Sequence, residues 1–561
     1  NLVATSSLID QKIGLQITTQ GGEQRDDRFQ LFFEQEQIAE KQIFKVKPST
    51  IRFRSNDWQI NPTNDPRQAL IFDLLSGTFT VEDLTIRTAD YSLAFSGFYQ
   101  QANDFELGLV LDQVELAAIL PQPKNFHMEG TATSRLRVKR SPSENLFLLN
   151  GIVEELKIND AVQGTFKINS QGNTKINAYA IDFSLVGNTV QTLTGLGNLT
   201  FTQEEPRLDL DMTFQEFDLV LLSPLGGDSL TDFKGSLDGT VNLYGPVSNL
   251  FHQGNLILNQ AEMFIPYTQT GLIFDPRTTV VLTEQKFLFG NTTISTAGVP
   301  GSALLNGSIS HTNFKNWSID FNFETAGIEI LNKPQTPEAL FYGKGIFAGN
   351  IALTGSFKNP LLALSGKTNS GTSIKIPWID SYTVADTSFI NFVAKNQTTT
   401  NAIQGSENEV NGLDVQIELE VTPQADVEIV IDEVSKSYLA GRGTGKLLMD
   451  IDTKGTFNMW GDFTTQEGIY NFKNLGVIDK KFSLKPGGTI VWEGDPLGAQ
   501  MRMEAVYQVP GGANPALLLD NPDFNRKIPT EVLIRLEGDL LKPENPSFEI
   551  DFPNTGGTVV T

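Results

Sequence analysis

The chain has 561 residues, and its 42 Lys and Arg against 66 Asp and Glu give a formal net charge of −24 at neutral pH. A negative surface repels the backbone of nucleic acids, so the composition argues against DNA or RNA as a partner. The sequence has no cysteine, which excludes disulfides, thiol nucleophiles and cysteine-ligated metals and is compatible with any redox compartment.

The sequence also lacks a membrane-spanning helix, because no stretch approaches 18 consecutive apolar residues. It starts at Asn1 without a Met or a signal peptide, and it stops at Thr561 just after a strand-like run. We therefore expect any membrane anchor or terminal docking element of the intact protein to lie outside this numbering.

Residues 1–104 have the composition of strands and turns. The pattern predicts strands at 13–18, 31–33, 51–53 and 79–86, with a turn at 64–66. Helix signals are weak along the whole chain. The candidates at 114–120, 217–222 and 337–341 are short and lie next to proline, so we expect brief helical turns between strands.

A seventeen-residue stretch at 105–121 organises the rest of the chain, since it recurs without gaps at 208–224 and with one inserted residue at 317–334. A shorter copy lies at 415–421, so successive copies start 103, 109 and 98 residues apart. Apolar residues alternate with polar or small ones in every copy, which predicts strands with one apolar face. These apolar residues are Phe105, Leu107, Leu109, Leu111, Leu208, Leu210, Met212, Phe214, Trp317, Ile319, Phe321, Phe323, Val415, Ile417, Leu419 and Val421.

A second repeat follows each copy at a nearly constant offset and begins at Gly130, Gly235, Gly345 or Gly441. It carries further alternating apolar residues, among them Val241, Leu243, Ile351 and Leu353. The two repeats together predict an array of units of about 100 residues, each contacting mainly its neighbours. We predict an N-terminal β segment at 1–104, repeats at 105–207, 208–316 and 317–414, and a last repeat with a C-terminal domain at 415–561.

The predicted fold class is all-β, a long, curled, open sheet with an apolar interior and few short helices. At about 12 to 14 residues for a strand and its turn, the chain holds on the order of 40 strands, too many for a closed barrel or a flat sheet. A continuous apolar stripe of this length needs a cover, because a soluble monomer exposes patches of only a few hundred Å². Either the two walls of the curled sheet close on each other, or a ligand fills the groove. The twenty apolar residues named for the two repeats are the expected lining of that groove.

Motifs that carry chemistry are weak in this sequence. Residues 440–446 (AGRGTGK) imitate a phosphate-binding loop, but Leu447 stands where Ser or Thr is needed, and a strand pattern follows in place of a helix. The pairs Asp209 with Asp211 and Asp450 with Asp452 are either acid–base or calcium-binding pairs, or part of a solvated face. The solvated face is the simpler interpretation, because the corresponding positions of the other repeats are also polar.

The histidines and the basic residues give no stronger signal. His127, His252 and His311 are scattered without metal-binding spacing. A basic run on one predicted strand either meets lipid head groups or forms a solvated outer face. No Ser-His-Asp arrangement, GxSxG elbow or HExxH motif occurs, so we expect no enzyme activity, no metal and no cofactor. The basic run comprises Arg135, Arg137, Lys139 and Arg140.

Several stretches resemble the TamB family and its AsmA-like relatives. GTVNLYGPVSN (239–249), GNLILNQAEMFIP (254–266) and GNIALTGSFKNPLLALSGK (349–367) resemble the repeating unit of that family. The stretches 454–472, 482–509 and 531–553 are similar to its C-terminal domain. The resemblance covers roughly residues 100–561 and is most specific at the C-terminal end.

The resemblance implies a location in the periplasm of a Gram-negative bacterium and a curled β groove with an apolar inside. It further implies an inner-membrane anchor, supplied by an N-terminal helix that is missing here, and docking of the C-terminal end to an outer-membrane barrel of the TamA-like assembly family. Two activities are implied: the passage of phospholipids between the two membranes, and assistance in assembling or exporting outer-membrane proteins.

Three functions therefore remain open from the sequence. The first is a lipid conduit, which an apolar trough with an open seam would favour. The second is an assembly factor that pairs client strands with exposed sheet edges, which edges free of Pro and charge would favour. The third is an inert elongated spacer, which a dry, interdigitated core would favour.

Overall fold

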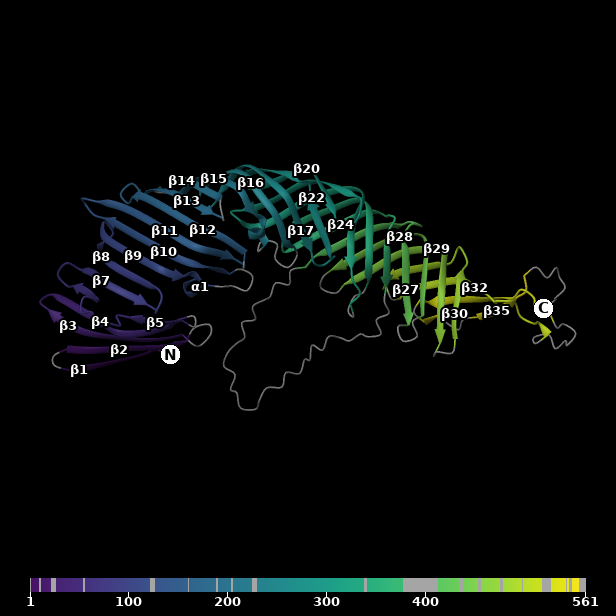
Figure 1. Cartoon of the computed structure of the whole chain (residues 1–561), viewed down its shortest axis with the longest axis horizontal. Coiled ribbons are helices and arrows are strands. Elements are labelled where there is room, and N and C mark those ends of the chain that lie inside the picture. Colours follow the sequence, from purple (N-terminus) through teal and green to yellow (C-terminus); the bar gives the residue numbers. More distant parts are fainter. Residues whose placement is uncertain are drawn as a thin grey trace. The chain divides into compact units, whose positions relative to one another are not determined.

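The structure is a computed structural model of the whole chain, and it is almost entirely β (Figure 1). The described part holds 35 strands, the helix α1 (Leu116–Ile119) and the 3-10 helix η1 (Leu219–Leu222). The predicted fold class, all-β with few short helices, is confirmed, and two of the three predicted helical turns lie where they were expected. The third, at 337–341, lies almost entirely outside the described residues. Described are residues 2–9, 12–21, 27–53, 56–121, 127–159, 161–187, 190–202, 205–223, 230–336, 341–376, 412–432, 437–452, 456–474, 478–496, 498–516, 526–540, 542–543 and 547–553.

Helices that could cross a bilayer were searched for within these ranges, and none is long and apolar enough. The chain divides into two compact units. Unit 1 comprises residues 1–262 and 276–288, and unit 2 comprises residues 263–275 and 289–561. This division falls inside the predicted repeat 208–316, and the predicted segment boundaries stay predictions.

Unit 1 is a ladder of antiparallel strands, and from β7 to β16 each strand pairs with the next one in the chain. The unit contains β1 (Leu2–Ile9), β2 (Lys12–Gly21), β3 (Asp27–Ile38), β4 (Lys41–Phe53), β5 (Asn56–Ile60), β6 (Ala69–Asp73), β7 (Thr78–Arg87), β8 (Ser92–Gln101), β9 (Asp104–Glu115), β10 (Met128–Arg140), β11 (Asn145–Ile158), β12 (Ala161–Asn173), β13 (Ala178–Val186), β14 (Gln191–Phe201), β15 (Pro206–Asp218), β16 (Thr231–Pro246), most of β17 (Phe251–Ile265), and β19 (Arg277–Glu284).

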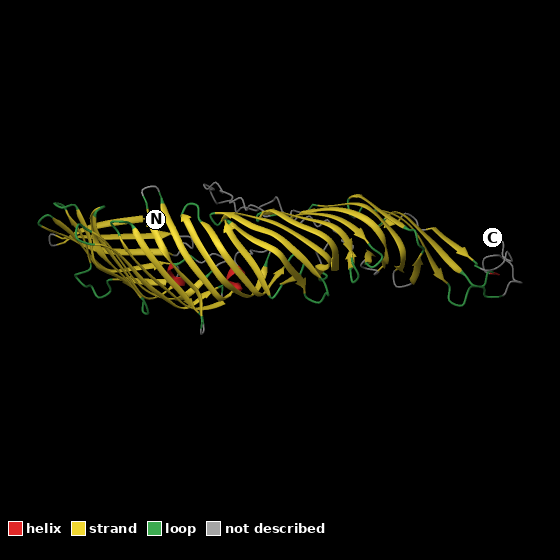
Figure 2. Cartoon of the chain, turned by 90° about the horizontal axis from the view of Figure 1, so that it is seen from above, coloured by secondary structure: helices red, strands yellow, loops and turns green. Residues whose placement is uncertain are grey.

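The sheet of unit 1 is curled. Trp58 of β5 and Val114 of β9 belong to one buried cluster, although β7 and β8 lie between these two strands in the ladder. Three steps of about 4.8 Å would separate the two side chains in a flat sheet, so the strands must wrap toward each other. The curvature of the strands is visible in Figure 2.

Unit 2 also consists of paired strands, and several of them are long. It contains β18 (Thr270–Phe274), most of β20 (Lys286–Thr296), β21 (Ser302–Thr312), β22 (Lys315–Lys333), β23 (Tyr342–Ser356), β24 (Asn359–Thr368), β25 (Ser373–Ile376), β26 (Asp414–Val421), β27 (Asp426–Asp432), β28 (Ser437–Asp452), β29 (Phe457–Asn474), β30 (Ile478–Leu484), β31 (Thr489–Gly494), β32 (Gln500–Gln508), β33 (Glu531–Asp539), β34 (Lys542–Pro543) and β35 (Ser547–Asp551).

Long strands of unit 2 pair with two shorter strands each. One half of β28 pairs with β26 and the other half with β27, and β29 pairs in the same way with β31 and β30. Both halves of each long strand contribute to one buried cluster, through Leu439 and Leu447 of β28 and through Met459 and Tyr470 of β29, so the halves form two walls around it. This cluster also includes Ile490, Met503, Ala505, Ile534 and Leu536, each at most 2% exposed.

The pairing of unit 2 includes two parallel pairs, β24 with β26 and β25 with β27. Parallel neighbours need a crossover connection, whereas antiparallel neighbours need only a hairpin. The chain between β25 and β26 supplies this connection, and its residues 377–411 lie outside the described ranges. The predicted change from the third to the fourth repeat coincides with this switch in strand direction.

Glycines of the second repeat lie where neighbouring backbones come close. Gly349 of β23 is directly opposite Gly366 of β24, and a Cβ atom at Gly349 would lie 2.4 Å from the carbonyl oxygen of Ser365. The φ angle of Gly349 is +150°, a backbone conformation that L side chains rarely adopt. Glycine is therefore needed at Gly349 because the backbones of two neighbouring strands approach closely there.

Candidate functional site

The candidate site is the face of each sheet that carries the alternating apolar residues, which we call the apolar face. In β9 the predicted residues Phe105, Leu109 and Leu111 are partly buried and Leu107 is exposed, and Asp112 next to Leu111 is also exposed. In β15, Leu210 is buried and Asp209 and Asp211 are exposed. Burial alternates clearly in β15, whereas in β9 both Leu107 and Val110 are exposed, and the assignment of the predicted residues to a groove stays a prediction.

Register brings the predicted residues of unit 1 into continuous rows. One row passes through directly opposite partners on seven strands and links Leu109 to Leu210. On the following strand, β16, Leu243 lies opposite Leu210 and continues this row. Val241 lies opposite Met212 in the neighbouring row. The members of the first row are Leu109, Leu136, Leu149, Ser170, Ile181, Gly197 and Leu210.

The residues that share a row in the sheet are not the residues that the alignment of the two sequence repeats equates; the two assignments differ by a shift of two residues. The ungapped repeat equates Leu109 with Met212, whereas the ladder places Leu109 in the row of Leu210. Stagger between successive strands accumulates to this offset. Because the offset is even, it leaves every side chain on the predicted face.

Unit 2 brings its predicted residues together in the same way. Phe321 is opposite Leu353, which is opposite Leu362, and the parallel pair continues the row to Val415. A neighbouring row contains Phe323, Ile351, Leu364 and Ile417, and a third contains Leu419. Trp317, Ile319 and Val421 continue the alternation on the same strands.

None of the residues of β11 to β14 is among the groove residues predicted from the sequence. Their apolar-face residues fill the sheet between the two predicted repeats. The available signal was the same period-two alternation, which is interrupted here by Gly and Ser and is therefore weaker. The missed residues are Phe147, Leu149, Phe166, Ile168, Tyr179, Ile181 and Phe183.

Aromatic side chains cover the glycines of this middle region. Phe147 and Tyr179 lie on either side of Gly172, and their rings are 5.0 Å apart in an edge-to-face arrangement. Tyr179 in turn contacts Phe201 at 5.6 Å. All three aromatic side chains retain solvent exposure, so the apolar face is covered by rings of its own and not by a second wall of the sheet.

The two edges of the apolar face in unit 1 differ in burial. At the edge where β9 and β15 run into α1 and η1, which we call the helical rim, side chains are buried. Val114 is 0% exposed, Ala118 4% and Leu219 4%. At the opposite edge, which we call the hairpin rim, the turns of β6–β7, β8–β9, β12–β13 and β14–β15 meet solvent. Phe72, Tyr99 and Phe201 of the apolar face are 44%, 54% and 44% exposed there.

The basic run of β10 is divided between the two faces of its strand. The Arg137 side chain pairs with Glu106 at 2.9 Å, and Lys139 pairs with Glu144 at 2.6 Å, both on the face opposite the apolar one. The ion pair with Glu144 raises the pKa of Lys139. Arg140, one residue further, is opposite Phe105 and Asn145 and therefore lies on the apolar face. The interpretation of all four cations as one outer patch is wrong for Arg140, because adjacent residues of a strand point to opposite faces.

The acidic pairs are surface residues in the structure. The side-chain amide of Asn242 donates to carboxylate oxygens of both Asp209 and Asp211 at 2.9 Å. Asp450 is exposed in β28, and Asp452 accepts a hydrogen bond from the backbone N–H of Thr456. The described residues contain no group of three or more His, Asp or Glu side chains that could hold a metal ion.

Residues 440–446 form part of β28 and not a phosphate-binding loop. A Cβ atom at Gly443 would lie 2.1 Å from the carbonyl oxygen of Thr464 on β29, so close strand packing accounts for this glycine. The segment lacks the helix N-terminus that would bind a phosphate.

Two histidines lie buried among aromatic rings. His311 stacks on Phe314 at 4.4 Å and lies 4.7 Å from Trp317, and burial lowers its pKa. Its Nδ1 atom accepts a hydrogen bond from the backbone N–H of Phe314. His252 packs on Phe287 at 4.6 Å. His127 directly precedes β10, is partly exposed and is far from both other histidines in the sequence. Among the described residues it is not part of any group of potential metal ligands.

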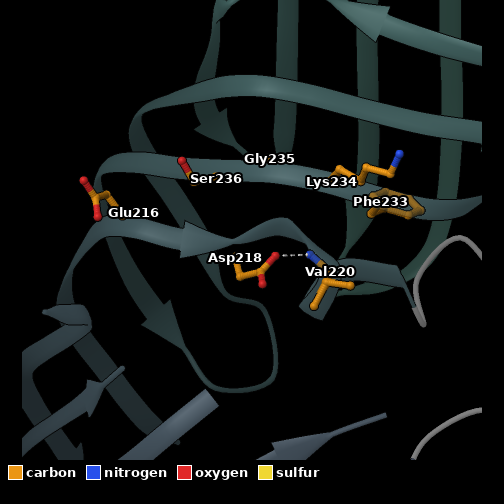
Figure 3. A pocket seen from close by; sticks show the side chains of 7 residues that line it. All are labelled: Glu216, Asp218, Val220, Phe233, Lys234, Gly235 and Ser236. Carbon is orange, nitrogen blue, oxygen red and sulfur yellow. Dashed lines mark hydrogen bonds between the residues drawn. The ribbon is translucent and has the colours of Figure 1, made fainter. Parts of the chain in front are cut away.

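A surface hollow of about 450 Å³ lies next to η1 (Figure 3). Two of its polar side chains have structural partners: the Asp218 carboxylate accepts from the backbone N–H of Val220 at 2.9 Å, and Lys234 pairs with Glu262 at 3.3 Å. These contacts cap the short helix and tie two strands together. The lining residues are Glu216, Asp218, Val220, Phe233, Lys234, Gly235 and Ser236.

Comparison with known proteins identifies one family. Residues 291–559 match the family model described as the TamB C-terminal domain. No curated protein and no solved structure matches the chain. The matched range includes the three C-terminal stretches that carried the resemblance in the sequence, and the resemblance is confirmed.

Proposed function

Since residues 291–559 match the C-terminal domain of the TamB family, we propose that the chain carries phospholipids along its apolar face between the inner and outer membranes. Proteins of this family are associated with the cell envelope and act in outer-membrane assembly or lipid transport. The choice of lipid transport, the periplasm of a Gram-negative bacterium as the location, and the absence of enzyme activity are our proposals.

The observation that supports a conduit is the partly exposed apolar face between β8 and β15, where Leu107 is 46% and Phe201 44% exposed. Acyl chains that replace water on such a surface gain about 0.8 kcal/mol for each buried methylene. The lining is apolar from row to row, so no single position on it binds an acyl chain much more strongly than the next. A lipid is therefore retained on the face and free to move along it.

The test is mass spectrometry of an organic extract of the purified chain, followed by transfer of labelled phospholipid between membranes in an intact protein. Co-purifying phospholipid and transfer that depends on the protein support the conduit. A clean extract together with bound unfolded outer-membrane protein would instead favour the role in protein assembly, and a clean extract without either would favour a spacer.

We also propose that the C-terminal end docks to an outer-membrane barrel of the TamA-like family, with the inner membrane reached through an anchor outside this sequence. Phe548 and Ile550 of β35 are 57% and 40% exposed, whereas Ile534 and Leu536 of β33 belong to the buried cluster. Deleting 531–561 would therefore damage the fold. Phe548 and Ile550 lie opposite Ile534 and Val532 but are not members of the buried cluster, so the double substitution Phe548→Asp with Ile550→Asp removes no cluster residue. It should abolish co-purification with the barrel, and unchanged co-purification would contradict docking through β35.

A further inference from the structure

Between β7 and β16, the described residues of the apolar face of unit 1 include one charged side chain, at the edge that is open to water. Within the described residues, Arg140 is the one charged side chain among the apolar-face positions registered from β7 to β16. It occupies the last position of β10 before the β10–β11 turn, in register with Phe105 on one side and Asn145 on the other. Tyr99 is the next residue of this row, opposite Phe105.

Arg140 differs from the other cations of its strand in having no acidic partner. Arg137 and Lys139 pair with Glu106 and Glu144 on the opposite face, whereas the part of the chain that the structure describes contains no carboxylate within ion-pairing distance of Arg140. A cation on an apolar surface without a counter-charge is costly unless an anion or water reaches it. In a chain with a net charge of −24, this position stands out as a place for an anion.

The burial of the apolar face is also directional. Side chains at the helical rim are buried, with Val114 and Leu219 at 0% and 4% exposure, and side chains at the hairpin rim are open, with Tyr99 and Phe201 at 54% and 44%. A ligand on this face must therefore leave its polar end at the hairpin rim. Tyrosine suits such a boundary, since its ring is apolar and its hydroxyl is polar.

We propose that Arg140 binds the phosphate of a phospholipid head group at the hairpin rim, while the acyl chains lie across the strands toward the helical rim. This deepens the proposed function and rests on it. Arginine is suited to the role, because its guanidinium donates two parallel hydrogen bonds to phosphate oxygens and keeps its charge. Arg140 is a positioning residue here: it fixes which edge of the face the head group occupies.

The strand itself supplies a matched control. Arg135 lies on the same strand as Arg140 but on the opposite face, where it is exposed. Substituting either residue by glutamine removes one positive charge from β10 and keeps a side chain of similar length. Only the substitution on the apolar face should affect a ligand that lies on that face.

The experiment measures equilibrium binding of two probes to the purified 561-residue chain: phosphatidylglycerol with a fluorescent acyl chain, and diacylglycerol with the same chain. Arg140→Gln should weaken phosphatidylglycerol binding about tenfold, the size expected of a charge-assisted hydrogen bond, and should leave diacylglycerol binding unchanged. Arg135→Gln should change neither, and Arg140→Lys should restore part of the affinity, because lysine keeps the charge but not the two parallel hydrogen bonds. Because the two probes differ in the phosphate-bearing head group, a mere loss of structure would weaken both.

Each other result has a definite meaning. Equal phosphatidylglycerol affinity in Arg140→Gln and the unaltered chain would overturn the role of Arg140 and leave the conduit standing. Failure of the unaltered chain to bind either probe would overturn the proposed function itself. Competition by glycerol 3-phosphate as strong as that by the lipid would show that Arg140 binds free phosphate, which would overturn the assignment to a lipid.

Discussion

Two regions of the molecule use the same alternating sequence pattern with different results. Between β8 and β15 of unit 1 the apolar face remains partly open, and Leu107 is 46% exposed. In β31 to β33 of unit 2 the apolar face is a dry core, and Leu536 is 0% exposed. The difference arises because both halves of β28 and of β29 contribute side chains to the cluster that buries Leu536, so these strands form a second wall against it. Alternation therefore determines which side chains face inward, and the presence of a second wall determines whether they form a core or a binding surface.

The largest effect is expected on transport, from a charge placed on the apolar face. Phe321 is opposite Leu353 and packs 5.4 Å from Phe289, while Asp320 points to the other face of β22. Phe321→Arg should reduce lipid transfer sharply in an intact protein, because an unpaired guanidinium in the lipid path costs several kcal/mol unless it reaches water. Asp320→Arg should leave transfer nearly unchanged. Equal behaviour of the two variants at equal expression would refute the face assignment or the conduit.

A second prediction concerns stability and compares two leucines. Leu536→Ala should destabilise the C-terminal part of unit 2 by about 2–5 kcal/mol, the usual cost of a buried leucine. Leu107→Ala should cost about 1 kcal/mol or less in unit 1, since its side chain is already half exposed. Denaturant unfolding followed by hydrogen exchange resolves the two regions. Similar losses at both positions would mean that the two regions are packed alike.

Tyr470 gives the closed region a predicted dependence on alkaline pH. Burial raises its pKa to about 12, above the value of about 10 of an exposed tyrosine. Stability from the neutral side chain is thus fully present below about pH 10 and declines as the pH rises toward 12, by up to about 3 kcal/mol. Tyr470→Phe should flatten this decline in a pH series of unfolding measurements. A decline of the same size in Tyr470→Phe would assign it to other groups.

The smallest effect on stability is expected from removing ion pairs on the solvent-facing side of the sheet, which both regions have. Glu504 pairs with Arg535 at 3.1 Å and with Lys485 at 3.3 Å, and these cations lower its pKa. Its contribution is present above the pKa of an unfolded glutamate and is lost as the pH falls through the lowered value. Glu504→Gln should cost about 1 kcal/mol or less, because the pairs are exposed. Glu106→Gln, on the corresponding face of unit 1, should cost a similar amount, and a cost of several kcal/mol at either site would show that the outer faces also differ.

Much of the fold was predictable from the sequence, for a local reason. The period of two in β9, β15, β22 and β26 assigns each side chain to a face, and any even shift in register preserves that assignment. The short helices α1 and η1 were predictable as well, because each follows an apolar strand and ends near a proline. The same alternation places Arg140 on the face opposite that of Arg135, Arg137 and Lys139. The interpretation of these four cations as one patch overlooks this alternation.

Other features depended on contacts between distant residues. The two-residue offset between the rows of the first two repeats results from the stagger of six successive strand pairs, to which no local pattern corresponds. The parallel pairs β24–β26 and β25–β27 depend on where the chain returns after a long connection. Strand propensity and alternation are identical for a covered and an uncovered face, so only the tertiary structure decided that unit 1 keeps an open apolar face while the C-terminal part of unit 2 closes over its own.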